Sequence, residues 1–174
     1  MPQLIINALG PDRPGIVGQV TGHLHAAGAN VLDSRMVNLR GQFALILLVE
    51  APPAALQKIH KSLPPLAEKI GLRLTLTDAA APATAPIKGI PFKLKTYSLD
   101  QPGIIHKISD LLREQGVNIE ELSARQESAP FAGTPLFLME MRLTIPPTVS
   151  ISALRTKLTT LCDTLNCDVD FEPA

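Results

Sequence analysis

Charge imbalance, aromatic side chains, cysteines and long apolar runs are all scarce in this 174-residue sequence, and each scarcity excludes a class of protein. Sixteen basic residues balance sixteen acidic ones, so the chain lacks the positive field that unaided binding to nucleic acid or an anionic membrane requires. Five Phe, one Tyr and no Trp leave no platform for stacking bases. We therefore expect no direct contact with nucleic acid and none with a membrane.

The two cysteines, Cys162 and Cys167, are too few for the disulfide framework of a small secreted domain. The sequence begins without a basic segment that leads into a long apolar core, and no stretch approaches the roughly 20 apolar residues of a membrane-spanning helix. These features predict a cytoplasmic protein. Hydrophobic residues make up 45% of the chain, which is enough to fill the cores of one or two folded domains.

What the sequence does contain is an internal repeat at an offset of 88 residues. Seven of the twenty positions from 12 to 31 are identical to the positions 88 further on, where typical residue frequencies predict roughly one or two. The identities are Asp12/Asp100, Pro14/Pro102, Gly15/Gly103, Ile16/Ile104, Leu24/Leu112, Gly28/Gly116 and Asn30/Asn118. The copies are separated by a stretch of alanine and proline that is typical of a linker. We predict domains at residues 1–78 and 89–174, joined by a linker at 79–88.

Both copies have the same predicted order of elements: strand, helix, strand, strand, helix, strand. In the first copy these are residues 4–9, 16–27, 30–39, 42–49, 54–70 and 72–77, and Pro64 and Pro65 should interrupt or kink the second helix. In the second copy they are residues 92–98, 103–115, 118–126, 136–145, 151–165 and 169–171. This order predicts an α+β fold of two ferredoxin-like βαββαβ domains, each an antiparallel sheet with both helices on one face.

The third strand of the first copy, residues 43–49, is apolar on both faces, whereas its counterpart in the second copy alternates apolar and polar residues. A strand with one face exposed to solvent should alternate apolar and polar residues. Two explanations remain open: this face of the sheet packs against the other domain or another subunit, or the strand is apolar without a partner. We favour the first explanation and expect a homo-oligomer or a closely packed tandem.

The candidate ligand site is the loop from Asp12 to Ile16, repeated from Asp100 to Ile104. Proline fixes the backbone where the helix begins, glycine lets a ligand approach the main chain, and the free N–H groups of the first turn can receive an anion such as a carboxylate. The aspartate could cap the helix or accept a hydrogen bond from a ligand ammonium group. A plain helix-initiating turn is the alternative, which the repetition of the loop disfavours.

Asn30 and Asn118 begin the second strand of each copy, which we expect to lie close to the loop. Each amide could bond a ligand carboxylate, or could only cap the preceding turn.

Catalytic and metal-binding residues are poorly represented. His23 and His25 are two positions apart on a predicted helix, so they point in nearly opposite directions and cannot share a metal ion. Through the repeat, His23 aligns with Leu111 and should be partly buried, whereas His25 should be in solvent. We expect the two cysteines to be packing residues. The sequence has no G-x-S-x-G, phosphate loop or dinucleotide fingerprint, so we expect no enzyme activity, no cofactor and no metal site.

Residues 9–17, the helix that ends at Gly28 and the sequence Ala29-Asn30-Val31 resemble an ACT domain, the amino-acid-sensing module attached to many metabolic enzymes. Residues 98–119 resemble a second one. Two ACT domains with nothing else resemble the glycine cleavage system transcriptional repressor family. The resemblance implies a small amino acid, glycine or serine, bound at Asp12, Gly15, Ile16 and Asn30, and at Asp100, Gly103, Ile104 and Asn118. Many ACT loops carry Asn where this chain has Asp12 and Asp100.

The resemblance also implies an amino-acid-responsive regulator of transcription that contacts a protein, such as a transcription activator, rather than DNA. The balanced charge of the chain agrees with this mechanism. The alternatives are a stand-alone ACT regulatory subunit of a metabolic enzyme and an interaction module that no longer binds a ligand.

Overall fold

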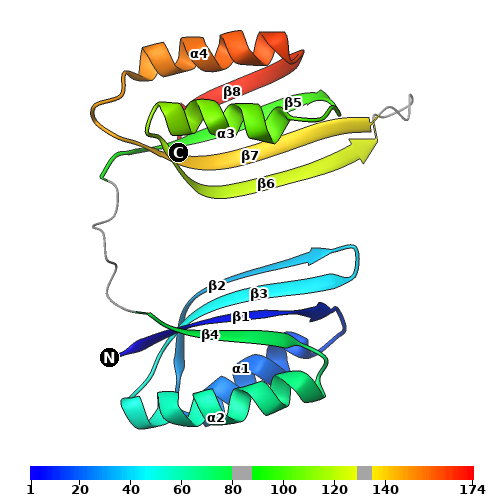
Figure 1. Ribbon diagram of the computed structural model, residues 1–174, viewed down its shortest axis with the longest axis vertical. Coiled ribbons are helices and arrows are strands. Elements are labelled where there is room, and N and C mark those ends of the chain that lie inside the picture. The colour runs from blue at the N-terminus through cyan, green and yellow to red at the C-terminus, as the bar shows by residue number, and fades with distance from the viewer. Residues whose placement is uncertain (80–87, 129–134) are drawn as a thin grey trace. The chain divides into compact units, whose positions relative to one another are not determined.

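The computed structural model describes residues 1–79, 88–128 and 135–174. The chain divides into two compact units, Met1–Thr84 and Ala85–Ala174. Most of the predicted linker, residues 80–87, lies outside the described residues. In each unit two helices cover one face of a four-stranded antiparallel sheet (Figure 1). None of the helices within the described ranges is long and apolar enough to cross a membrane.

The first unit contains β1 (Gln3–Pro11), α1 (Ile16–Ala26), β2 (Asn30–Leu39), β3 (Gln42–Glu50), α2 (Pro53–Lys69) and β4 (Arg73–Ala79). Its strands are arranged in the order β2-β3-β1-β4, and all neighbours are antiparallel. Arg40 and Gly41 join β2 to β3 with φ angles of 50° and 81°. Two successive positive φ angles give the tight turn whose twist suits a hairpin.

The second unit repeats this architecture with β5 (Ile90–Leu99), α3 (Ile104–Glu114), β6 (Asn118–Ser128), β7 (Pro135–Ile145), α4 (Ile151–Thr164) and β8 (Cys167–Pro173). Its sheet order, β6-β7-β5-β8, is the counterpart of the first. The predicted α+β class and the predicted order of elements are confirmed: the chain is a tandem of two ferredoxin-like domains.

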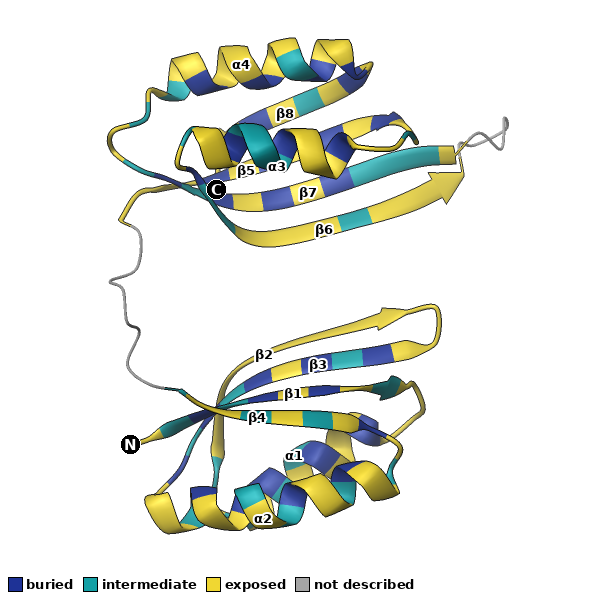
Figure 2. Cartoon of the chain, viewed as in Figure 1, coloured by how far each residue is buried: buried dark blue, intermediate teal, exposed yellow. Residues whose placement is uncertain are grey.

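Each unit has its own apolar core between its sheet and its helices, and Figure 2 shows the buried residues as stripes on the helices. Residues at matching positions fill the two cores: Ile16, Val20 and Leu24 of α1, and Ile104, Ile108 and Leu112 of α3. A spacing of four residues places each triplet on one helix face. The internal repeat therefore preserves the residues that hold each first helix against its sheet.

Of the two predicted effects of Pro64 and Pro65 on the second helix, an interruption is wrong, because α2 continues through both prolines to Lys69. Each proline lacks an N–H group and therefore costs the helix a hydrogen bond. Leu63 and Ala67, on either side, are buried in the core. Burial of this face stabilises the helical path that the local sequence disfavours.

Candidate ligand site

The loop between β1 and α1 ends at a glycine in the left-handed region. Gly15 is the N-cap residue of α1 and has a φ angle of 88°, and Gly103 occupies the same position before α3 with a φ angle of 96°. Residues with a Cβ atom adopt such angles at an energetic cost. Both glycines of the repeated motif are therefore needed for the backbone to enter the helix.

The start of each first helix is open. The first intrahelical bond of α1 runs from Gln19 N–H to the Gly15 carbonyl (2.9 Å), and that of α3 runs from Lys107 N–H to the Gly103 carbonyl (2.9 Å). The N–H groups that precede these donors have no acceptor inside the helix. Neither helix has a side-chain cap or an acidic residue in its first turn. The positive end of each helix dipole is therefore available to an anion such as a carboxylate.

The isoleucines that follow these glycines place their side chains in the hydrophobic cores. Ile16 and Ile104 are 1% and 2% exposed and belong to the two cores. Only the backbone N–H of either residue can therefore take part in a ligand site.

Asp12 connects the loop to the β2–β3 turn. Its Oδ2 accepts a hydrogen bond from Asn38 Nδ2, and its backbone N–H donates to the Gly41 carbonyl at 2.8 Å. The Gly41 N–H in turn donates to Asn38 Oδ1 at 3.0 Å. Asp12 does not cap α1, so that alternative from the sequence is not realised. The carboxylate instead sets the position of the loop relative to the hairpin.

Asp100 makes the corresponding connection in the second unit. Its Oδ2 accepts a hydrogen bond from Gln126 Nε2 at 2.6 Å, and its backbone N–H donates to the Pro135 carbonyl at 3.1 Å. The carboxamide donors Asn38 and Gln126 are 88 positions apart, the offset of the repeat. Our sequence reasoning missed both residues, although extending the alignment to conservative pairs would have found them.

The prediction that Asn30 lies close to the loop of its own domain is wrong. Asn30 and Gln3 both pair with Glu50, whereas Pro11, where the loop begins, pairs with Gln42. Eight residues of extended strand separate the two places, which is a distance of about 27 Å. The reason is topological: α1 runs back along β1, so β2 begins at the opposite end of the sheet.

Asn118 is likewise distant from its loop, since it pairs with Thr144 at the far end of β7. Its Nδ2 donates to Glu120 Oε1 at 2.6 Å. This hydrogen bond is the main reason why the pKa of Glu120 lies below its usual value, and a hydrogen bond from the Thr144 side chain is the second. Within one unit, therefore, the asparagine and the loop cannot hold the same small ligand.

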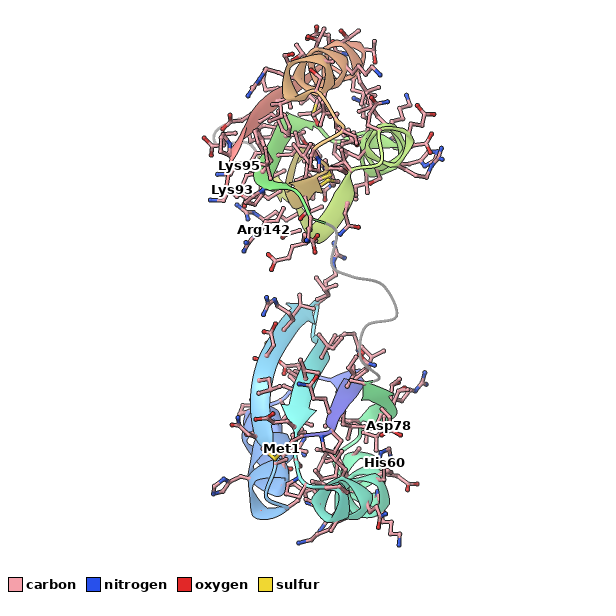
Figure 3. The ribbon with its side chains drawn as sticks, turned by 90° about the vertical axis from the view of Figure 1, so that its left-hand side faces the viewer. Met1, His60, Asp78, Lys93, Lys95 and Arg142 are labelled. Carbon is pink, nitrogen blue, oxygen red and sulfur yellow. The ribbon has the colours of Figure 1, made fainter. Side chains whose placement is uncertain are left out.

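Histidines and cysteines make local contacts away from these loops. His60 Nε2 lies 3.0 Å from Asp78 Oδ1 (Figure 3), and His23 Nε2 lies 2.7 Å from Ser62 Oγ. The Ser62 hydroxyl donates to a backbone carbonyl, so it accepts from His23 rather than giving up its proton to it. As predicted, His23 is partly buried and His25 is exposed. The described residues contain no group of three or more His, Cys, Asp or Glu side chains that could hold a metal ion.

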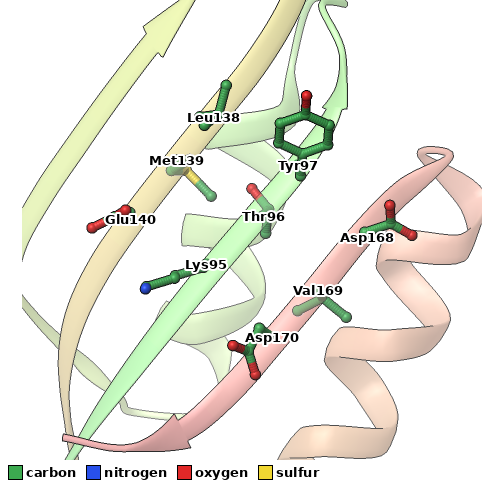
Figure 4. Close-up of a pocket in the computed structure, with 9 residues that line it drawn as sticks. All are labelled: Lys95, Thr96, Tyr97, Leu138, Met139, Glu140, Asp168, Val169 and Asp170. Carbon is green, nitrogen blue, oxygen red and sulfur yellow. The ribbon is translucent and has the colours of Figure 1, made fainter.

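A hollow of about 280 Å³ lies on the sheet of the second unit (Figure 4). Its lining residues come from β5, β7 and β8, and include Lys95, Tyr97 and Glu140. None comes from the Asp100 loop or from a helix. This hollow therefore belongs to the sheet surface that faces away from the helices, and not to the site that the repeated motif marks.

The fold and the two matched loops define this chain as a tandem of ferredoxin-like α+β domains with an open helix start in each domain. Residues 2–77 match the family model of the ACT domain. The first unit, which these residues span, therefore matches an ACT domain. The match covers the first unit, and the second unit has the same topology and the same loop.

Two similar proteins cover nearly the whole chain, and a third matches less than half of it. The glycine cleavage system transcriptional repressor of Escherichia coli strain K12 is 27% identical over 163 residues, which are 94% of this chain and 85% of that protein. A UPF0237 protein of Methanococcus maripaludis is 30% identical over 78 residues, 44% of this chain and 87% of that protein. The crystal structure of an unknown protein from Galdieria sulphuraria superimposes with a TM-score of 0.80 at 28% identity and covers 99% of this chain and 98% of that one.

Proposed function

We propose that this chain is a non-catalytic cytoplasmic regulator that responds to a small amino acid and controls transcription through contact with another protein. The observation that carries the proposal is the similarity to the glycine cleavage system transcriptional repressor, which extends over both domains. A relative that shared one domain alone would support only a common module.

The charge of the chain supports contact with a protein rather than with DNA. Sixteen Lys and Arg residues are balanced by sixteen Asp and Glu residues. Proteins that bind DNA unaided neutralise several phosphates with a basic surface. A regulator with no net positive charge acts on transcription through a partner that supplies the basic surface, such as a transcription activator.

The two loops support the response to an amino acid. A free amino acid carries a carboxylate and an ammonium group on adjacent atoms. The open start of α1 offers N–H groups and a positive dipole to the carboxylate. Asp12 uses Oδ2 for Asn38, which leaves Oδ1 to accept from the ammonium group. Asp100 and Gln126 repeat this arrangement before α3.

Calorimetric titration of glycine and serine into the full chain tests this assignment. We expect binding of at least one of them, and expect Asp12→Asn combined with Asp100→Asn to weaken it, because the amide loses the charge that attracts the ammonium group. Asp78→Asn is the matched control, since Asp78 pairs with Leu4 at the far end of the first sheet. Equal binding by all three proteins would contradict the loop assignment.

The partner is tested separately. When the chain is added to labelled duplex DNA at physiological salt, we expect no change in the fluorescence anisotropy of the DNA. We also expect the immobilised chain to retain a transcription activator from a protein mixture, and expect added glycine or serine to change the amount that is retained. Direct DNA binding would contradict the proposed mechanism. Retention of a partner that no amino acid alters would favour a ligand-free interaction module, and retention of a metabolic enzyme would favour a regulatory subunit.

A further inference from the structure

The sheet of the first unit has an apolar surface on the side that faces away from the helices. Strand residues alternate, so the residues between the buried ones point to this side. We call it the open face; its apolar residues are Ile5, Leu9, Val37, Leu39, Ala44, Ile46 and Leu48. Leu39 is 65% exposed, and Leu9, Val37 and Ile46 are between 44% and 48% exposed.

The register of the strands makes these side chains neighbours. Leu9 and Val37 both pair with Ala44 from opposite sides, and Ile5 pairs with Leu48. Ile46 lies between these two rows on β3. The apolar residues of the open face therefore adjoin one another along β3, where Ile46 is flanked by Asn7 on β1 and Arg35 on β2.

The same face of the second unit is charged. Leu9 and Ala44 correspond to Tyr97 and Leu138, which pair in the same way. The register also matches five apolar residues of the first unit to charged residues of the second: Ile5/Lys93, Val37/Arg125, Leu39/Glu127, Ile46/Glu140 and Leu48/Arg142. Figure 3 shows Lys93, Lys95 and Arg142 together on the second unit. The fold itself therefore does not require an apolar open face, and five apolar residues at charged positions indicate a surface that is covered.

The charges around the patch indicate what covers it. The open face of the first unit carries Asp33, Arg35, Glu50 and Arg73, two of each sign; the first two and Arg73 lie on the edge strands β2 and β4, and Glu50 lies at the end of β3. Asp33 and Arg35 form an ion pair with each other at 2.5 Å. A neutral surface with an uncharged centre matches an identical surface, as a two-fold symmetric interface requires. We infer that the first units of two copies of this chain pack open face against open face.

The size of the face is sufficient. Four strands about 4.8 Å apart and nine residues rising about 3.4 Å each give a face of roughly 19 by 30 Å. Two such faces together bury on the order of 1,100 Å², which passes the lower limit of roughly 1,000 Å² for a specific interface. Two stacked sheets about 10 Å apart would interdigitate the Leu, Ile and Val side chains as in a β-sandwich.

Sedimentation equilibrium of the full chain tests this interface. We expect a dimer at micromolar concentrations and expect Ile46→Glu to weaken dimerisation by roughly a hundredfold or more, because the new carboxylate would lose its water where the two faces meet. Arg35 is the cross-strand neighbour of Ile46, so the new charge has an opposite charge beside it and the monomer should keep its circular dichroism spectrum.

Tyr97→Lys is the matched control. Tyr97 is 43% exposed on the open face of the second unit, and Asp168 is the cross-strand neighbour that accommodates the new charge. We expect this variant to remain dimeric. Leu39→Glu, near the β2–β3 turn, serves as the second variant if Ile46→Glu fails to fold, and it should also give monomers. A monomeric wild type at about 100 µM, a folded interface variant as dimeric as the wild type, or equal loss of dimer in the control would overturn the inference.

Discussion

Replacing Gly15 with Ala measures what the left-handed start of α1 requires. Gly15 has a φ angle of 88°, and a Cβ atom added there would meet only Gln19 Nε2, at an ordinary contact distance of 3.7 Å. The substitution therefore adds backbone strain and no steric clash. A residue with a Cβ atom pays about 1–2 kcal/mol in this region, so the free energy of unfolding of the first unit should fall by that amount.

Gly22→Ala is the internal control for this prediction, because Gly22 lies inside the same helix with open space around its Cβ position. Alanine there reduces the entropy that the unfolded chain loses, and should raise the free energy of unfolding by about 0.5–1 kcal/mol. The same chemical change should thus have opposite effects at two positions seven residues apart.

Urea unfolding followed by circular dichroism distinguishes these effects. With a slope of about 1–2 kcal/mol per molar urea, the midpoint should fall by about 1 M for Gly15→Ala and rise by about 0.5 M for Gly22→Ala. Gly15→Ala as stable as the wild type would refute the view that the loop needs a left-handed residue at the helix start. Equal destabilisation by both variants would show instead that α1 tolerates no added methyl group.

Three further predictions concern the second unit. Gly103→Ala should repeat the effect of Gly15→Ala, followed by the fluorescence of Tyr97, the single tyrosine of the chain. Asn118→Ala should raise the pKa of Glu120 measured by NMR titration, and an unchanged pKa would contradict the hydrogen bond between these residues. Because folding lowers the pKa of Glu120, its ionised carboxylate stabilises the fold at pH values above the pKa of the unfolded chain. This stabilisation is lost as the pH falls through the pKa of the folded state. Burial, followed by the nearby Cys167, raises the pKa of the Cys162 thiol to about 12. Alkylation of Cys162 by iodoacetamide at pH 8 should therefore be slow in the folded chain and fast in urea. Rapid modification without denaturant would show that this part of the core opens.

The internal repeat contributes more to the prediction of this fold than any single motif does. One Asp-x-Pro-Gly loop is compatible with a plain helical turn. The second copy at an offset of 88 residues marked a duplicated unit, and the confirmed strand β2, Asn30–Leu39, shows how well the hairpin could be predicted from β-branched residues and the Arg40-Gly41 turn. Local periodicity and turn residues were sufficient for this level of structure.

The candidate site was less predictable from the sequence. The partners of the loop aspartates lie 26 positions further along in each unit, across the β1–β3 and β2–β3 pairings of the first unit and the β5–β7 and β6–β7 pairings of the second. Such contacts depend on register, which no local pattern specifies. The position of Asn30 depends on the helix before it: α1 has eleven residues and spans about 17 Å, so the strand that follows begins far from the loop at the start of the helix.

The number of units, their α+β class and the glycines at which each first helix begins could all be predicted from the sequence, because periodicity, repetition and backbone conformation are properties of short segments. Three outcomes follow from long-range packing instead: Asp12 and Asp100 bind carboxamides and do not cap helices, Asn30 and Asn118 lie at the far ends of their sheets, and α2 continues through two prolines. Those outcomes depend on strand register and on burial of whole helix faces, which are energies of contacts between distant segments.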